Sequence, residues 1–219
     1  MGKTTLLDDA ADSAVELWVA RISGIEAEVD FGVDLGHLAL AILELGRGDH
    51  RGALASASKV FEHDPPVQGT RILQELVEAA IRTGERDQAE AAFERLAERA
   101  AASGTPWALG VLARATALMA ADEEAEALYR EAIVQLGRTY VRTDLARAYL
   151  LYGEWLRRQD RRVDARGELS SAHDMFSAMG AQVAGLAATG ATNGEIAGKL
   201  YLRPKPSTTT CGRCTGSSG

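Results

Sequence analysis

The sequence predicts an all-α protein in which antiparallel helical hairpins stack on one another. Residues 35–179 are rich in Ala, Leu, Glu and Arg and contain no run of β-branched residues, a composition that favours helices. Short polar breaks interrupt this region at residues 46–52, 82–88, 120–124 and 157–162. Each break separates two amphipathic stretches of about 14–18 residues, which is the pattern of a helix, a turn and a second helix.

The hairpins repeat in sequence, because residues of similar size recur at matching places in each of them. The reference alanines are 36, 36 and 40 residues apart: Ala53, Ala89, Ala125 and Ala165. Four and seven positions later come Ala57, Phe93, Tyr129 and Leu169, and Val60, Leu96, Ala132 and Ala172. Twelve positions earlier lie Ala41, Val77, Ala113 and Gly153, each after a larger apolar residue, namely Leu40, Leu76, Leu112 and Tyr152. Small residues at facing positions let the two helices of a hairpin approach closely.

This spacing resembles the tetratricopeptide repeat (TPR), which has a small residue on its first helix and an Ala-x3-aromatic-x2-Ala pattern on its second. Pro65 stands where that repeat often closes. The resemblance implies a TPR-like solenoid over residues 35–179, and a generic bundle of Ala-rich amphipathic helices is the alternative. In either architecture the repeat positions form the core. We expect the aromatic side chains to pack there rather than to contact a ligand: Phe93, Trp107, Tyr129 and Trp155.

The chain opens on half of a phosphate-binding motif. Gly-Lys-Thr-Thr at residues 2–5 matches the second half of the P-loop pattern G-x-x-x-x-G-K-[ST], whose backbone amides cradle phosphates. The preceding strand and the first glycine are missing, so we expect an inactive remnant of a nucleotide site at Gly2, Lys3 and Thr4. Residues 15–22 fit either a strand of the same domain or a helix. We interpret residues 1–31 as the remnant of a P-loop ATPase domain. We expect that this remnant no longer binds ATP and that the protein has no cofactor.

Residues 182–202 predict two short helices joined by a turn. The two apolar faces consist of Val183, Leu186 and Ala187, and of Ile196, Ala197 and Leu200. Gly190 stops the first helix, and Thr192 or Asn193 caps the second. Glu195 lies three residues after Thr192 and completes a capping box. The pattern is that of a helix-turn-helix fragment.

Residues 188–200 read A-x-G-A-T-N-x-E-I-A-x-x-L, which closely resembles the C-terminal DNA-binding domain of LuxR-type transcription regulators. The chain is most similar to the large ATP-binding regulators of that group, in which a P-loop ATPase precedes a TPR-like region and then this domain. The usual T-x-x-E opening of the domain is absent before Gln182. The resemblance implies that DNA is a partner, with contacts from Thr192, Asn193 and Lys199. It also implies a protein or small-molecule effector on the helical repeats.

The tail, residues 203–219, has no helical or strand period, and Pro204 and Pro206 cannot lie inside a helix, so we expect disorder there. The family has a basic recognition helix at this place. GC-rich codons for this tail, read from two bases later, encode A-E-T-V-D-Y-H-L-R-K-V-Y-R-K-L-G, which fits the register of that helix. We therefore hypothesise a frameshift near residue 203 and expect impaired DNA binding.

Composition limits the classes of function and location. No apolar run approaches the roughly 20 residues of a membrane span, and the first residues lack the features of a secretory signal, so we expect a cytoplasmic protein without a membrane partner. The net charge is −7, whereas a nucleic-acid binder normally concentrates positive charge at its DNA-binding surface. Residues 182–202 contain one acid, Glu195, and one base, Lys199.

Candidate catalytic and metal-binding groups are few. The two cysteines, Cys211 and Cys214, supply only two of the four ligands of a structural zinc site, and the histidines show no metal-like pairing. Residues 35–179 contain no cysteine nucleophile, no serine in a strand-turn-helix elbow and no cluster of histidine with acidic residues. We therefore expect neither a metal site nor enzymatic activity. Two hypotheses follow: a LuxR-type regulator by descent, or a stand-alone TPR-like adaptor that binds a protein or peptide without DNA.

Overall fold

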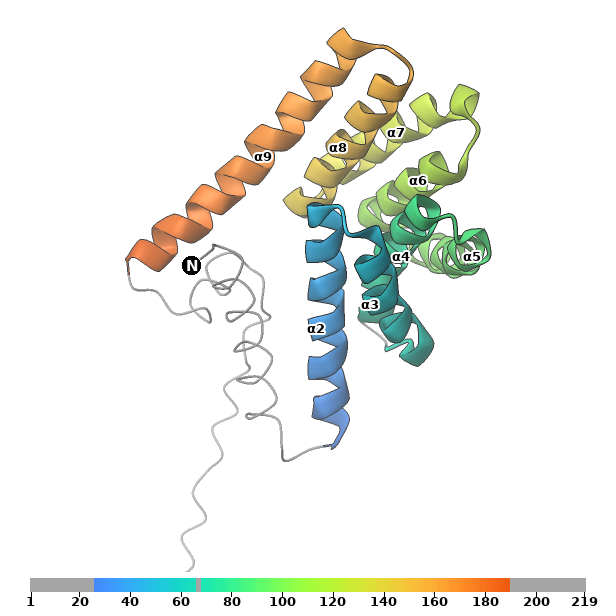
Figure 1. The fold of residues 1–219 in the computed structure, drawn as a ribbon, viewed down its shortest axis with the longest axis vertical. Coiled ribbons are helices and arrows are strands. Elements are labelled where there is room, and N and C mark those ends of the chain that lie inside the picture. Colours follow the sequence, from blue (N-terminus) through green and yellow to red (C-terminus); the bar gives the residue numbers. More distant parts are fainter. Residues whose placement is uncertain (1–25, 66–67, 190–219) are drawn as a thin grey trace, which may run out of the picture. The chain divides into compact units, whose positions relative to one another are not determined.

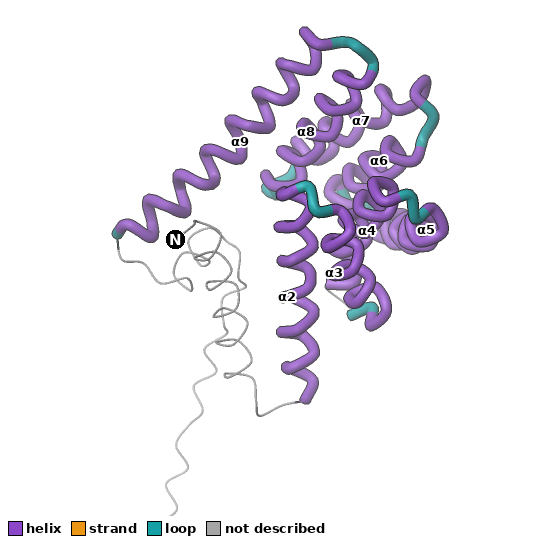
Figure 2. Tube along the Cα trace, in the orientation of Figure 1, coloured by secondary structure: helices purple, strands orange, loops and turns teal. Residues whose placement is uncertain are grey.

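The computed structural model of the protein describes residues 26–65 and 68–189. Within these ranges the chain forms helices joined by short loops and no strand, which confirms the all-α prediction (Figures 1 and 2). The helices are α2 (Glu26–Arg47), α3 (His50–His63), α4 (Gln68–Thr83), α5 (Arg86–Ser103), α6 (Pro106–Met119), α7 (Asp122–Gly137), α8 (Arg142–Arg158) and α9 (Arg162–Ala188). None of them is long and apolar enough to cross a membrane.

The predicted breaks coincide with the turns of the helical hairpins. Each break contains the two- or three-residue connection within one pair of helices: α2 and α3, α4 and α5, α6 and α7, and α8 and α9. From α2 to α8, consecutive helices pack against each other, and α4 also contacts α2 and α6. The helices α2, α4, α6 and α8 are therefore the first helices of successive hairpins, as the repeat in the sequence predicts.

Glycines end the first helices of two hairpins in the same way. Gly48 and Gly84 have φ of 79° and 83°, in the left-handed region that glycine occupies without steric cost. Their amides donate to carbonyl oxygens of the preceding helices, at 3.2 Å to Leu45 and 3.4 Å to Ile81. The two glycines stand 36 residues apart, so this turn is itself part of the repeat.

The small residues predicted to face each other are buried. All four reference alanines are at most 2% exposed, as in Ala53 (0%) and Ala165 (2%), and Ala41, Val77, Ala113 and Gly153 are buried as well. Among the larger residues Tyr129 and Leu76 are buried, whereas Phe93, Leu169, Leu40 and Leu112 are only half-buried. The half-buried residues lie at helix faces that no further layer of helices covers completely.

The chain divides into two compact units, one ending at Ala172 and the other beginning at His173. The first contains α2 to α8 and the first turns of α9. The described part of the second, residues 173–189, continues α9 to Ala188. Helix α9 thus runs without interruption through residues 180–181, where the sequence led us to expect the boundary between the repeats and the DNA-binding segment.

An aromatic cluster holds the last hairpins of the first unit together. Tyr129 of α7 stacks on Tyr152 of α8 at a centroid distance of 5.6 Å, and Trp155 lies 6.1 Å from Tyr152 and 6.2 Å from Tyr129. Ala165 of α9 belongs to the same buried cluster. Three aromatic rings bury a large apolar area, so this contact fixes α8 against α7 and gives α9 a firm surface.

Helices α8 and α9 approach closely because residue 153 is a glycine. A Cβ atom at Gly153 would lie 2.7 Å from Cγ of Leu169 and 3.2 Å from its backbone nitrogen. Real Cβ atoms do not approach other atoms so closely, and a backbone atom cannot move aside as a side chain can. The small residue that the repeat predicts at this position therefore sets the distance between the two helices.

We predict that Gly153→Ala lowers the free energy of unfolding by about 1–3 kcal/mol, because the added methyl group pushes α9 away from α8. Urea denaturation followed by circular dichroism measures the change.

The matched control is Gly167→Ala. Gly167 lies in α9 with nothing within 4 Å of its Cβ position, so the substitution should stabilise by about 0.5–1 kcal/mol through helix propensity. If Gly153→Ala and Gly167→Ala changed the free energy of unfolding equally, α8 and α9 would not be in close contact at Gly153.

Candidate functional site

Polar side chains of three first helices meet between the helices in three groups of hydrogen bonds and ion pairs, which we together call the polar seam. Its members are Gln74, Glu75, Glu78 and Arg82 of α4, Trp107 and Arg114 of α6, and Asp144, Arg147 and Glu154 of α8. Most of these side chains are buried, although charged residues are rarely buried unless they are paired.

The seam joins α4 directly to α8, two hairpins further along the chain. Gln74 Nε2 donates to Asp144 Oδ1 at 3.3 Å, and Arg147 donates to Glu78 through Nε at 3.0 Å and through Nη2. The partners advance in the same direction along both helices, so α4 and α8 run parallel. Trp107 of α6 joins them by donating from its indole to Asp144 Oδ2 at 2.7 Å.

Arg114 is the central cation of the seam. The residue is 1% exposed, and its Nη2 donates to Gln74 Oε1 at 2.9 Å and lies 3.9 Å from Glu75 Oε1. Burial raises the pKa of Glu75 to about 7, because the ionised carboxylate loses its water. Arg114 opposes this shift, and the carboxylate of Glu78 adds to it.

The side chains of the polar seam fill the space between α4 and α8. Gln74, Glu78 and Asp144 are each at most 5% exposed, so side chains fill the space that a peptide would occupy in an open groove. A ligand that binds this part of the chain therefore needs another surface.

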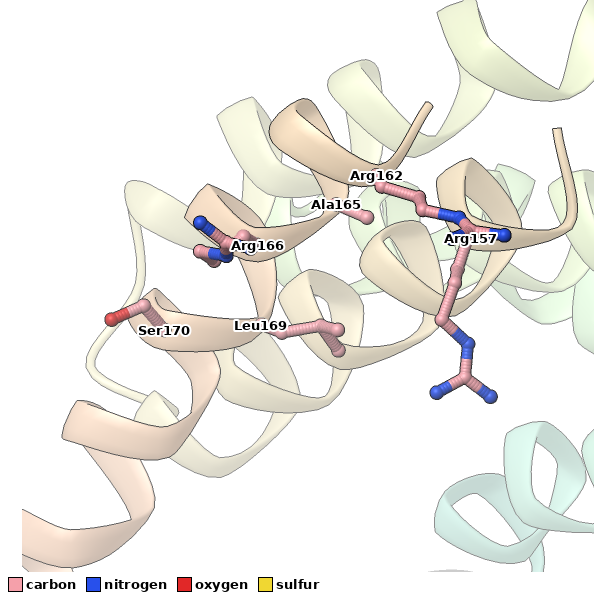
Figure 3. A pocket seen from close by; sticks show the side chains of 6 residues that line it. All are labelled: Arg157, Arg162, Ala165, Arg166, Leu169 and Ser170. Carbon is pink, nitrogen blue, oxygen red and sulfur yellow. The ribbon is translucent and has the colours of Figure 1, made fainter. Parts of the chain in front are cut away.

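An open pocket lies where α8 ends and α9 begins (Figure 3). It has a volume of about 740 Å³ and is lined by Arg157, Arg162, Ala165, Arg166, Leu169 and Ser170. Arg157 comes from the last turn of α8, and the other five residues come from the first turns of α9. We call it the basic pocket, because every charged residue in its lining is an arginine.

The arginines of the basic pocket have few partners. Arg162 Nη2 lies 3.9 Å from Asp160 Oδ1, and both side chains are more than 80% exposed, so this ion pair is weak. Within the described residues, the guanidinium groups of Arg157 and Arg166 form no hydrogen bond or ion pair. Their positive charges are therefore free to meet a ligand.

The neighbouring Arg161 behaves differently. Its Nη1 donates to Glu126 Oε2 and its Nη2 lies next to Asp164 Oδ2, both at 2.8 Å. Hydrogen bonding from Arg161 holds the pKa of Glu126 below its usual value. Arg161 thus ties α9 to α7 and contributes to the position of the pocket rather than to its lining.

The lining supports binding rather than covalent chemistry. Ser170 supplies the one hydroxyl of the lining, and no histidine or carboxylate lines the pocket to act as its base. Guanidinium groups are fixed forks of donors that match carboxylates and phosphates, and the half-buried Leu169, with the buried Ala165 behind it, provides an apolar wall. No group of three or more possible metal ligands occurs in the described part of the chain.

The site residues predicted from the sequence lie outside the described residues. This applies to both sets: Gly2, Lys3 and Thr4, and Thr192, Asn193 and Lys199. Of the aromatic residues expected to pack, Tyr129 and Trp155 are buried, whereas Trp107 is half-buried and donates to Asp144.

Sequence reasoning missed both the polar seam and the basic pocket. From the sequence we predict only a polar break at residues 157–162 and a core position at Ala165, although residues 157–166 gather five arginines in an acidic chain. Gln74, Glu78 and Arg82 follow each other at intervals of four on one face of α4, which could have indicated a polar stripe. The partners of that stripe lie about 70 residues away, so the pattern alone could not reveal them.

Comparison with known proteins gives no relative: no family model matches the chain, and no curated protein matches it significantly.

We predict that Glu75 makes stability depend on pH. Its pKa is raised above that of the unfolded chain, so the folded state holds the proton more tightly, and stability falls as pH rises from about 4.5 through about 7. Glutamine resembles the protonated acid, so Glu75→Gln removes this loss. Above pH 7 the free energy of unfolding of the variant should exceed that of the wild type by a value on the order of 3 kcal/mol.

Urea denaturation between pH 5 and 8 measures the difference in unfolding free energy between variant and wild type, which should grow with pH. The control is Glu98→Gln, which alters an exposed glutamate of α5. A difference that stays constant with pH, or an equal trend in the control, would show that Glu75 is not buried as described.

Proposed function

We propose that the chain is a LuxR-type transcription regulator by descent, in which helical hairpins receive a signal and a C-terminal segment contacts DNA. The observation that carries this proposal is the order of the segments. An array of helical hairpins, whose turns fall at the breaks in the sequence, leads directly into residues 188–200 with their family-like string.

Helix α9 supports this interpretation. It begins in the basic pocket with Arg162 and continues to Ala188, immediately before the residues expected to contact DNA: Thr192, Asn193 and Lys199. A pocket on the helix that leads into a DNA-binding segment is a reasonable place for a signal to act.

The proposed DNA contact follows from the physics of the helix-turn-helix. The second helix of this motif enters the major groove, where its side chains contact base edges while neighbouring groups hold phosphates. The tail at residues 203–219 replaces the basic part of that helix with a segment containing Pro204 and Pro206. DNA binding by this chain is therefore weak under the proposal.

The adaptor alternative needs a different surface from the one usually used by such repeats. The polar seam fills the face between α4 and α8, so a peptide cannot lie between these helices. Nothing in the described residues favours the adaptor over the regulator.

We predict that replacing residues 203–218 by A-E-T-V-D-Y-H-L-R-K-V-Y-R-K-L-G strengthens binding to short GC-rich duplex DNA about tenfold or more. The physical reason is that a basic helix in the groove adds phosphate contacts. The same contacts should make affinity fall between roughly 50 and 200 mM salt. Fluorescence anisotropy of labelled DNA measures both.

Two charge reversals in the restored protein separate a DNA-binding segment from net charge. Lys199→Glu should weaken binding, whereas Lys59→Glu, which alters an exposed lysine of α3, should leave it nearly unchanged. If the restored protein binds no tighter than the original chain, or if both reversals weaken it equally, the proposal is wrong.

A further inference from the structure

We propose that the basic pocket binds a small organic anion that carries a phosphate or carboxylate group next to an apolar body. The inference does not depend on DNA binding and would hold for an adaptor as well. It rests on the charge of the lining, the absence of partners for two arginines within the described residues, the apolar wall and the size of the pocket.

The charge of the pocket contrasts with that of the chain. The protein has 31 acidic and 24 basic residues, yet all three charged residues of the lining are Arg157, Arg162 and Arg166. The three guanidinium groups give the lining a net positive charge, which attracts an anion. Arg161 shows that nearby arginines of the same segment do form ion pairs where a carboxylate is within reach.

The arrangement of the lining indicates a ligand with two parts. In Figure 3, Ala165 and Leu169 lie between Arg166 and Ser170 on one side and Arg157 on the other. An anionic group can accept from a guanidinium fork while an apolar body lies against the half-buried Leu169. A purely inorganic anion would leave the apolar wall uncovered.

The size of the pocket agrees with a small molecule. Its volume of about 740 Å³ lies within the roughly 300–1,000 Å³ that pockets for small ligands occupy. Nucleic acid would need a basic track along several elements, whereas these arginines are confined to one hollow on two helices. A small organic anion therefore fits the observations better than a nucleic-acid strand.

The apolar wall is held in place before a ligand arrives. Ala165 packs in the aromatic cluster with Trp155, and Leu169 lies close against Gly153 of α8. Because this apolar wall is already ordered, binding costs less conformational entropy. Only the exposed arginine side chains have to become ordered when a ligand binds.

The test is isothermal titration of the full chain with 1-naphthyl phosphate, with 1-naphthoate as the carboxylate counterpart. At least one of them should bind, more tightly than 1-naphthol, which lacks the charge, and than inorganic phosphate, which lacks the apolar body. The double variant Arg157→Gln/Arg166→Gln should weaken binding about tenfold or more. The matched control, Arg51→Gln, alters an exposed arginine of α3 outside the pocket and should leave binding unchanged.

Several outcomes would overturn the inference: no binding of either anion, equal binding of 1-naphthol or inorganic phosphate, or equal binding by the double variant. If the double variant does not fold, protection of Arg157 and Arg166 from phenylglyoxal by the bound anion replaces it as the measurement, and absence of protection overturns the inference. These results are independent of the DNA measurements, which use different variants and a different ligand.

Discussion

Buried carboxylates are the constraint on which the arrangement of α4, α6 and α8 depends. An ionised carboxylate loses several kcal/mol of hydration when it leaves water, and it stays in the interior only where donors replace that water. Glu78 meets Arg147, and Asp144 meets both Gln74 and Trp107. Because these partners come from different hairpins, the helices cannot shift relative to one another without leaving a charge unpaired.

This constraint reaches the basic pocket through α8. The polar seam holds α8 through Asp144, Arg147 and Glu154, and the aromatic cluster holds its second half through Tyr152 and Trp155. Gly153, which lies between Tyr152 and Trp155 in the sequence, sets the distance to α9, which carries most of the pocket lining. The pocket is thus built on a fixed helix pair, and its arginines extend from that base into solvent.

The same interactions separate the two surfaces that could bind a partner. The inner face between α4 and α8 is occupied by the chain's own polar side chains, whereas the end of the last hairpin offers unpaired cations beside an apolar wall. In the proposed regulator, a signal would therefore act at the hairpin that precedes the DNA-binding segment in sequence. The proposed small anion is a chemically defined candidate for that signal.

The sequence by itself determined the local structure. Ala-rich amphipathic stretches specify helices, Gly48 and Gly84 specify turns, and small residues at intervals of 36 to 40 specify which helix faces meet, because these features act over a few residues or repeat regularly. The polar seam and the basic pocket, in contrast, exist only in the tertiary structure. Glu78 and Arg147 are 69 residues apart and belong to no repeat pattern, so their contact arises only when the hairpins stack. Arg157, Arg162 and Arg166 line one pocket only because Gly153 lets α9 lie close against α8.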